Sequence, residues 1–467
     1  CSGVRVAEGA AVFVLLMIAV RYAAAYRLPM LAFALLALAL APQDWPQWRG
    51  PSFDGSSAVT GLPGELSADK GVRWSSAMPG PSAATPIVLG ERVFVTAAVA
   101  DAGVLLALCL ERKTGAVRWE DEAGSGYQPR GKGTKTQLDN RSDYASPSPV
   151  AHERGVVFLF GNGDLVAYDL DGKRQWARNL QKEYGDFAFQ WTFGASPMLF
   201  EGRLYLPILQ RDEPTDGSAS EHALSSFLLA LELASGKELF RVTRPSPAQK
   251  ESLESYATAI PHVAGARREL LVVGGDVLTG HDLLTGAELW RWGTWNEGHR
   301  EPWWRIVPSP VVGGEHVLVC APKRAPAYAV KLGGSGTLGA EALAWQSSGR
   351  PNPVSSDVPT PLFYQGRFFV LSEGGTLSRV EPVTGKVEWS TELPDRNPWE
   401  ASPTGADGKV WCVSHAGVLV GVDATKGSVL VQASFGDDEG EPVRASLAAA
   451  HGALFLRLPS SLLCLGS

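Results

Sequence analysis

Aromatic and charged residues precede a series of Ser-Pro and Thr-Pro pairs along the chain, and they form the main candidate binding site. The set consists of Tyr144, Trp191, Tyr256, Trp304, Arg305, Asp357, Trp399, Glu400 and Arg444. Aromatic faces beside guanidinium and carboxylate groups suit an amphipathic, polyhydroxylated or extended-peptide ligand. In the alternative interpretation the charges pair with one another, and Glu400 and Arg444 are then direct partners. The sequence leaves both interpretations open.

Two further motifs resemble ligand loops but lack a required part. The segment Gly334–Gly339 matches the GxGxxG pattern, but a dinucleotide loop must open a helix, and here a short strand-like run follows at Ala342–Trp345. The segment Asp169–Gly172 resembles half a calcium loop. Because no glutamate follows at the required spacing, it is interpreted as a turn.

The four cysteines beyond Cys1 lie apart from one another in apolar, strand-like runs. They are Cys109, Cys320, Cys412 and Cys464. We expect buried free thiols rather than a disulfide. No Cys-x-x-Cys pair and no Cys/His cluster with metal spacing occurs, so no metal site and no catalytic residue is assigned.

The elements that position the candidate residues belong to a repeat. A Ser/Thr-Pro pair, or a weaker copy of it, followed by apolar residues occurs eight times, roughly 42–64 residues apart, the spacing expected of propeller blades. The copies begin at Thr85, Ser148, Ser196, Ile260, Ser309, Thr360, Ser402 and Ser446.

A second motif follows most copies: an apolar strand, a Thr-Gly or similar turn, and then a tryptophan. The clearest case is Leu165–Asp169, followed by Gly172 and Trp176. Each unit therefore reads as four short strands, with the Ser/Thr-Pro strand innermost and the tryptophan on the outermost. We expect the tryptophans of this motif to pack between adjacent blades, namely Trp119, Trp176, Trp290 and Trp389.

The last copy lacks a tryptophan strand, whereas an unpaired strand of this kind, Gly71–Trp74, precedes the first copy. If Gly71–Ser76 pairs with the Leu454–Leu463 region, the ring closes without an open edge. The expected fold is therefore all-β, an eight-bladed β-propeller of four-stranded blades closed by an N-terminal strand.

The N-terminal residues differ from the repeat. Two apolar runs, Ala10–Val20 and Leu28–Ala41, are each shorter than the roughly 20 residues of a membrane-spanning helix. The second run resembles a secretory signal peptide, with a membrane anchor as the alternative. The expected organisation is a signal peptide or upstream extension at 1–41, an N-terminal segment at 42–70 and the propeller at 71–467.

Composition limits the function classes. The net charge of −7 argues against a nucleic-acid binder, which needs a basic surface. The hydrophobic fraction of 45% permits a large core. With 51 glycines and 32 prolines the chain suits many short strands and turns. We expect a monomer.

The Ala-x-Asp-x-x-Thr-Gly-x-x-x-Trp pattern resembles the repeat of pyrroloquinoline-quinone-type propellers. The segment Trp45-Pro46-Gln47-Trp48-Arg49-Gly50-Pro51 resembles the opening signature of a secreted subgroup, the PQQ-binding-like β-propeller repeat proteins. It is interpreted as sealing the propeller, with docking of a partner as the alternative. The resemblance extends from Trp45 to Ser467. The superfamily includes quinoprotein dehydrogenases and non-catalytic propellers such as the outer-membrane-protein assembly factor, so the fold alone does not choose between them.

The resemblance implies specific residues for the enzymatic members. Quinoprotein alcohol dehydrogenases carry an adjacent cysteine pair, a Glu/Asn/Asp set for Ca2+ and an aspartate base, and none of these can be assigned here. The expected role is a secreted binding or assembly scaffold in the periplasm or cell envelope, without a cofactor and without a transmembrane span in the mature chain. Its ligand would be an envelope protein, a peptide or a polysaccharide. The alternative is an alcohol or sugar dehydrogenase that uses pyrroloquinoline quinone with Ca2+.

Overall fold

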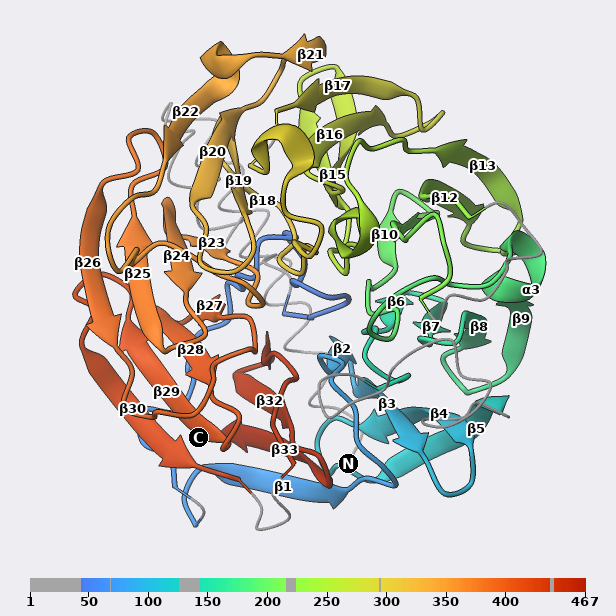
Figure 1. Ribbon diagram of the computed structural model, residues 1–467. Helices are drawn as coiled ribbons and strands as arrows, with labels where there is room; N and C mark the ends of the chain where they lie inside the picture. The colour runs from blue at the N-terminus through green and yellow to red at the C-terminus, as the bar shows by residue number, and fades with distance from the viewer. Residues whose placement is uncertain (1–42, 68, 126–142, 216–223, 294, 437–440) are drawn as a thin grey trace, which may run out of the picture. The chain divides into compact units, whose positions relative to one another are not determined.

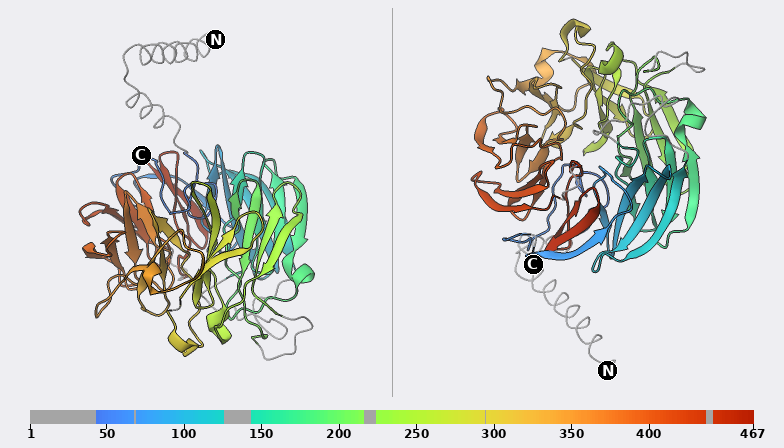
Figure 2. Two further views of the ribbon diagram at one scale, coloured as in Figure 1. Left: turned by 90° about the horizontal axis from the view of Figure 1, so that it is seen from above. Right: turned by 60° about the horizontal axis from the view of Figure 1, so that its bottom comes forward.

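The computed structural model describes residues 43–67, 69–125, 143–215, 224–293, 295–436 and 441–467. Eight β-sheets from this part of the chain are arranged as blades around a central channel (Figure 1), which confirms the predicted β-propeller. Figure 2 shows the blades from the side and obliquely. The predicted signal peptide or extension, 1–41, lies outside the described residues. The proposed boundaries at 42–70 and 71–467 remain predictions.

Each blade is an antiparallel meander that runs outward from the channel. From the innermost strand outward, blade 1 consists of β2 Ile87–Leu89, β3 Arg92–Val99, β4 Val104–Glu111 and β5 Val117–Ser125. Blade 2 consists of β6 Val150–His152, β7 Gly155–Leu159, β8 Asp164–Asp169 and β9 Arg174–Asn179. Blade 3 consists of β10 Met198–Phe200, β11 Arg203–Ile208, β12 Phe227–Glu232 and β13 Glu238–Thr243. One short helix, α3, spans Leu180–Tyr184 after β9.

Blades 4 and 5 follow the same order, with one addition to blade 4. Their strands are β14 Ile260–Ala264, β15 Arg267–Gly274, β16 Val277–Asp282, β17 Glu288–Trp292 and β21 Gly336–Leu338; and β18 Val311–Gly313, β19 His316–Cys320, β20 Ala327–Lys331 and β22 Leu343–Gln346. Short 3-10 turns occur at Lys250–Leu253, Glu297–His299 and Ala340–Ala342.

Blades 6 to 8 complete the ring. Their strands are β23 Leu362–Tyr364, β24 Arg367–Leu371, β25 Thr376–Val380 and β26 Val387–Glu392; β27 Thr404–Ala406, β28 Lys409–Val413, β29 Val418–Asp423 and β30 Val429–Ser434; and β31 Ala448–Ala450, β32 Ala453–Arg457, β33 Ser461–Gly466 and β1 Val72–Ala77.

The N-terminal strand closes the ring as predicted. Strand β1 pairs antiparallel with β33, so that Trp74 lies opposite Cys464 and Ala77 opposite Ser461. The observed partner begins near the end of the predicted Leu454–Leu463 region, because β32 occupies the first part of that region as the next strand inward. The blade therefore has no free edge where the chain ends meet.

Blade 4 departs from the four-strand expectation. The glycine-rich segment Gly334–Gly339 contributes β21, which pairs in parallel with β17. A 3-10 turn and β22 follow it, and no α-helix does. The segment is thus part of a sheet, in agreement with its rejection as a dinucleotide loop.

The outer strands carry aromatic side chains that pack on the next blade. The indole of Trp176 lies against Gly236, where an added Cβ would come within 2.7 Å of the ring. Its Nε1 donates to the carbonyl of Leu233 at 3.0 Å. The same pair of contacts, with a turn glycine and a turn carbonyl of the following blade, is made by Trp74, Trp119, Trp345 and Trp389.

The prediction of inter-blade packing is therefore confirmed for Trp119, Trp176 and Trp389. Trp290 also belongs to the apolar cluster shared by blades 4 and 5, but its indole nitrogen has a different partner. The Nε1 of Trp290 donates to Glu269 of its own blade at 2.7 Å. Strand β21 also pairs with this part of β17, with Gly336 opposite Trp290.

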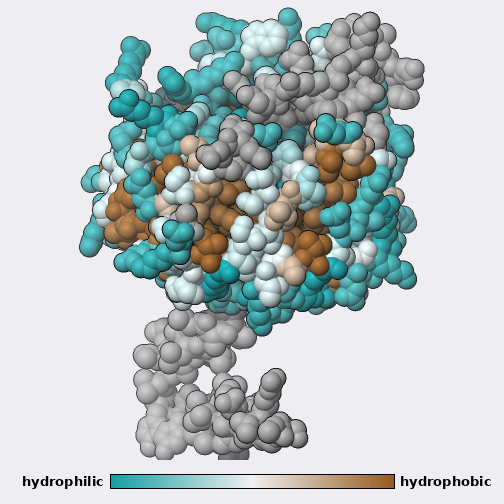
Figure 3. Space-filling view, turned by 90° about the horizontal axis from the view of Figure 1, so that it is seen from below, coloured by the Kyte–Doolittle hydropathy of each residue, from teal (hydrophilic) through white to brown (hydrophobic). Residues whose placement is uncertain are grey.

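The four described cysteines are free and buried in strands, as expected. Burial raises the pKa of Cys320 to about 12, so these thiols are not reactive nucleophiles. Large exposed hydrophobic residues lie in outer strands of several blades, among them Val117, Leu239 and Leu430. On the side shown in Figure 3, apolar residues form separate areas among hydrophilic ones. No helix in the described part of the chain is long and apolar enough to cross a membrane.

Candidate binding site in the central channel

A ring of serine and threonine hydroxyls joins the blades where the inner strands begin. Seven of these hydroxyls, all except that of Thr85, accept a hydrogen bond of 2.9–3.0 Å from the backbone N–H of the corresponding residue in the preceding blade. These links connect, in order, Thr85, Ser148, Ser196, Thr258, Ser309, Thr360, Ser402 and Ser446. The predicted Ser/Thr-Pro pairs thus have a structural cause: the hydroxyl bridges two blades, and the proline, which has no N–H, follows it just before the strand.

The ring corrects the fourth copy of the repeat. The sequence pattern placed it at Ile260-Pro261, but Thr258 Oγ1 accepts from Ser196 and the Thr258 N–H donates to Ser309. Pro261 instead lies within β14. The Ser/Thr-Pro pattern does not include this position, because Thr258 is followed by alanine.

The N-terminal strap, defined here as residues 44–62, crosses the ring. Trp45 exchanges backbone hydrogen bonds of 2.9 and 2.8 Å with Val88 of blade 1. The carbonyl of Pro46 accepts from Ala151 of blade 2 at 2.8 Å, and the Gln47 side chain accepts from Leu199 of blade 3 at 3.0 Å.

Arg49 fixes the strap to the opposite side of the ring. Its guanidinium donates to the carbonyls of Pro361 at 2.6 Å and Pro403 at 2.9 Å, in blades 6 and 7. A Cβ at Gly55 would overlap this guanidinium at 1.9 Å, so only glycine fits there. These contacts with the inner strands favour the sealing role of Trp45–Pro51 over docking of a partner.

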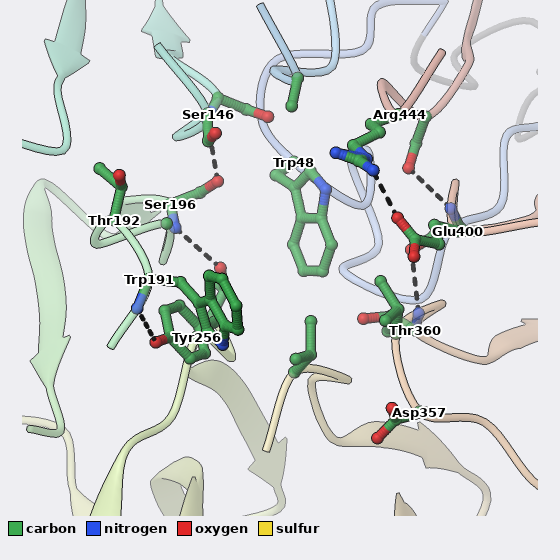
Figure 4. A pocket seen from close by; sticks show the side chains of 18 of the residues that line it. Trp48, Ser146, Trp191, Thr192, Ser196, Tyr256, Asp357, Thr360, Glu400 and Arg444 are labelled. Carbon is green, nitrogen blue, oxygen red and sulfur yellow. Dashed lines mark hydrogen bonds and ion pairs between the residues drawn. The ribbon is translucent and has the colours of Figure 1, made fainter. Parts of the chain in front are cut away.

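A cavity of about 450 Å³ lies inside the ring. Six of the nine predicted site residues line it: Trp191, Tyr256, Arg305, Asp357, Glu400 and Arg444. The strap contributes Trp48, which Figure 4 shows between the Trp191–Tyr256 side and the Arg444–Glu400 side. The repeat therefore brings residues from six blades, blades 3 to 8, to one site.

The other three predicted residues do not line this cavity. Trp399 is fully buried and donates its Nε1 to the carbonyl of Asp395 at 3.1 Å. Tyr144 is 8% exposed within the core of the first blades. Trp304 packs against the apolar residues between blades 4 and 5. Their aromatic rings are used for packing, which the sequence could not distinguish from a place in the channel.

Four charged residues of the cavity form two ion pairs. Arg305 binds Asp357 through two N–O contacts of 3.0 and 3.4 Å. Arg444 Nε donates to Glu400 at 3.0 Å, as the pairing interpretation predicted, and His415 Nε2 lies 2.9 Å from the same oxygen. The two guanidinium groups are therefore neutralised within the site.

Glu373 is a cavity residue that the sequence analysis missed. Burial and the neighbouring carboxylates of Asp357 and Glu400 raise its pKa to about 7, although Arg305 and Arg324 act in the opposite direction. It lies in the turn between β24 and β25, whereas the candidate residues predicted from the sequence all precede inner strands. The Glu-Gly-Gly sequence of this turn was the available signal.

The aromatic side of the cavity is held by a buried network. The Tyr256 hydroxyl donates to Glu254 at 2.5 Å and accepts from the Trp191 N–H at 3.1 Å. Arg211 pairs with Glu254. Burial raises the pKa of Glu254 to about 7. This network fixes the ring of Tyr256 at the cavity wall.

The dehydrogenase alternative implies a calcium-quinone site with a set of metal donors and an adjacent cysteine pair. Within the described ranges, no group of three or more His, Cys, Asp or Glu side chains could hold a metal ion. The described cysteines lie in β4, β19, β28 and β33, each in a different blade, so none forms an adjacent pair.

Comparison with known proteins gives one family. The profile of the outer membrane protein assembly factor BamB matches residues 40–194 and 336–460, more than half of the chain. No curated protein matches the chain.

Solved structures share the fold at low sequence identity. A europium-containing methanol dehydrogenase has a TM-score of 0.64 at 12% identity, with 91% of each chain covered. The quinohemoprotein alcohol dehydrogenase from Comamonas testosteroni has a TM-score of 0.62 at 14% identity, covering 96% of this chain and 84% of that chain. BamB from Moraxella catarrhalis has a TM-score of 0.56 at 12% identity, covering 85% of this chain and 97% of that chain.

Proposed function

The chain belongs to the family of the outer membrane protein assembly factor BamB, and on this premise we propose that it is a non-catalytic binding or assembly protein of the cell envelope. The family description concerns the assembly of outer membrane proteins, so the proposed partner is an envelope protein. In this proposal residues 1–41 direct the chain out of the cytoplasm, and the protein acts as a monomer in the periplasm or at the envelope.

The observation that carries the proposal is the composition of the central cavity. Aromatic rings from the strap and from blades 3 and 4 face ion pairs from blades 5 to 8. A cavity with apolar faces and a few fixed polar groups is typical of a binding site. Because the ring hydrogen bonds and the strap hold these groups in place, little ordering is needed when a ligand binds.

The dehydrogenase alternative has support only from the fold. The similarity to methanol and alcohol dehydrogenases is at 12–14% identity, and a shared fold does not transfer an activity. The described cysteines also form no adjacent pair of the kind that the resemblance implies for the enzymatic members.

Affinity capture from native envelope extract, with the mature chain as bait, tests the proposal. We expect one or a few envelope proteins to be retained at near-stoichiometric amounts. In parallel, the protein is titrated with pyrroloquinoline quinone and Ca2+ and assayed for dye reduction with alcohols and sugars. Stoichiometric quinone uptake with substrate-dependent dye reduction, and no captured protein, would replace the proposal by the dehydrogenase alternative.

A further inference from the structure

We propose that the central cavity receives the cationic side chain, lysine or arginine, of an extended polypeptide. This inference rests on the proposed function and adds the chemistry of recognition to it.

The charge balance of the cavity favours a cation. Both guanidinium groups that line it are already paired, Arg305 with Asp357 and Arg444 with Glu400. The carboxylate of Glu373 has no hydrogen bond or ion pair with the described residues, yet it lines the same cavity. Three carboxylates thus face two guanidinium groups, and the one without a partner is available to an incoming positive charge.

The electrostatic surroundings of Glu373 support the same conclusion. Burial and the repulsion from Asp357 and Glu400 raise its pKa to about 7, while Arg305 and Arg324 partly offset this effect. His415 also faces the site through its contact with Glu400. A bound ammonium or guanidinium group would stabilise the ionised form of Glu373 and relieve the repulsion.

Aromatic faces provide the second element of cation recognition. Trp48, Trp191 and Tyr256 line the cavity, and Figure 4 shows the Trp48 indole in its middle. The guanidinium of Arg49 lies 5.8 Å from the centroid of the Trp48 ring, so this indole already interacts with one cation. Aromatic rings beside a carboxylate attract ammonium and guanidinium groups.

The shape of the cavity suits a side chain that enters from one end. Its volume of about 450 Å³ exceeds the needs of a single ion. The strap crosses the ring at the turns of the inner strands, where Asp44 accepts from the Gly90 N–H at 2.7 Å and pairs with His451. Glu373 lies in the turn between β24 and β25, at the end of blade 6 where β23 begins. A side chain that enters from the end opposite the strap can therefore place its charge beside Glu373.

Calorimetric titration of the full chain tests this inference with small probes. The probes are Nα-acetyl-lysine amide, its uncharged analogue Nα-acetyl-norleucine amide, the anionic Nα-acetyl-glutamate amide, and butylamine as a free amine. At pH 8 we expect the lysine probe to bind at least about tenfold more tightly than the norleucine and glutamate probes, since one charge-assisted contact has that order of effect. Affinity should weaken at pH 6, where Glu373 is mostly protonated.

Two variants separate Glu373 from the protein's other charges. E373Q should lower the affinity for the lysine probe about tenfold at pH 8. It should also remove most of the difference in affinity between pH 6 and pH 8. E153Q is the matched control, because the Glu153 side chain is 87% exposed and lies outside the cavity. It should bind the probe like the wild-type protein.

Equal binding of the lysine and norleucine probes, or unchanged binding by E373Q, would overturn the inference. Butylamine binding as tightly as the lysine probe would assign the cavity to free amines and contradict the polypeptide ligand. These outcomes are distinct from failure of the proposed function. An envelope protein captured equally by wild type and E373Q would retain the binding role and place it on another surface.

Discussion

Single hydroxyl groups explain much of the regularity of this chain. In seven of the eight blades one serine or threonine hydroxyl accepts a hydrogen bond of 2.9–3.0 Å from a backbone N–H of the preceding blade. At the junction of the first and last blades the side-chain oxygen of Thr85 is buried without a hydrogen-bond partner among the described residues. The ring of hydroxyls therefore has its weakest link where the chain ends meet, and closure depends more on β1 and the strap.

The titration of Glu373 should appear in the stability of the protein. Folding raises its pKa from 4.5 to about 7, so between these values the folded protein holds a proton that the unfolded chain has released. The contribution of Glu373 to the free energy of unfolding is therefore fully present at low pH, and it is lost as the pH rises through 7. E373Q should be more stable than wild type by about 1–2 kcal/mol at pH 8, after allowance for solvent screening, and nearly equal to it at pH 4.5.

Urea unfolding of both proteins at the two pH values measures this difference. The surface variant E153Q controls for the general effect of removing one negative charge. A stability difference between wild type and E373Q that does not change with pH would contradict the assignment of the titration to Glu373.

The tryptophan of the repeat offers a second test at the level of single residues. Trp176→Ala should lower the free energy of unfolding by about 2–4 kcal/mol, because it removes the half-buried indole on Gly236 and leaves the Leu233 carbonyl without its donor. Trp176→Phe keeps an aromatic ring at this position and should lower the free energy of unfolding much less. Thermal and urea unfolding provide the measurement, and an unchanged melting temperature for Trp176→Ala would show that the inter-blade contact does not stabilise the ring.

Two elements close the propeller in different ways. Strand β1 completes the last blade by pairing with β33, whereas the strap joins inner strands across the channel. The buried Arg49 shows how strongly the strap is embedded: burial lowers its pKa to about 10, despite the nearby Asp54. Each element uses residues that precede the first blade, so the N-terminal segment is part of the propeller's stability.

Three N-terminal truncations separate the two contributions. A chain that begins at Asp44 retains both the strap and β1. A chain that begins at Gly71 retains only β1, and a chain that begins at Met78 retains neither. The chain that begins at Met78 should have a free energy of unfolding more than about 3 kcal/mol below that of the chain that begins at Gly71, and it should aggregate more. The reason is that loss of β1 exposes a strand edge and removes the buried Trp74. Unfolding and light scattering are the measurements, and equal stability of the chains from Gly71 and Met78 would refute closure by β1.

At the scale of the whole molecule, the sequence was sufficient for the architecture but not for the whole site. The eight copies of the Ser/Thr-Pro pattern predicted eight blades, and the Thr-Gly-Trp motif predicted their outer strands, because local patterns determine the strands. The sequence did not predict the position of Trp48 or Glu373 in the cavity, since one belongs to the strap and the other to a turn inside a blade. It also misplaced Trp399, because an aromatic residue that packs in a blade and one that faces the channel look alike in sequence.

The central claim, that an envelope protein binds in the channel, is tested most directly by filling the cavity. Gly194 lines it, and an added Cβ would meet no atom closer than 3.8 Å. Gly194→Ala should therefore leave envelope capture unchanged, whereas Gly194→Trp should fill the cavity and abolish capture without lowering the melting temperature. Gly64→Trp, at an exposed glycine outside the cavity, is the control for an added indole. Capture of the same proteins in the same amounts by Gly194→Trp, folded and stable, would contradict the claim.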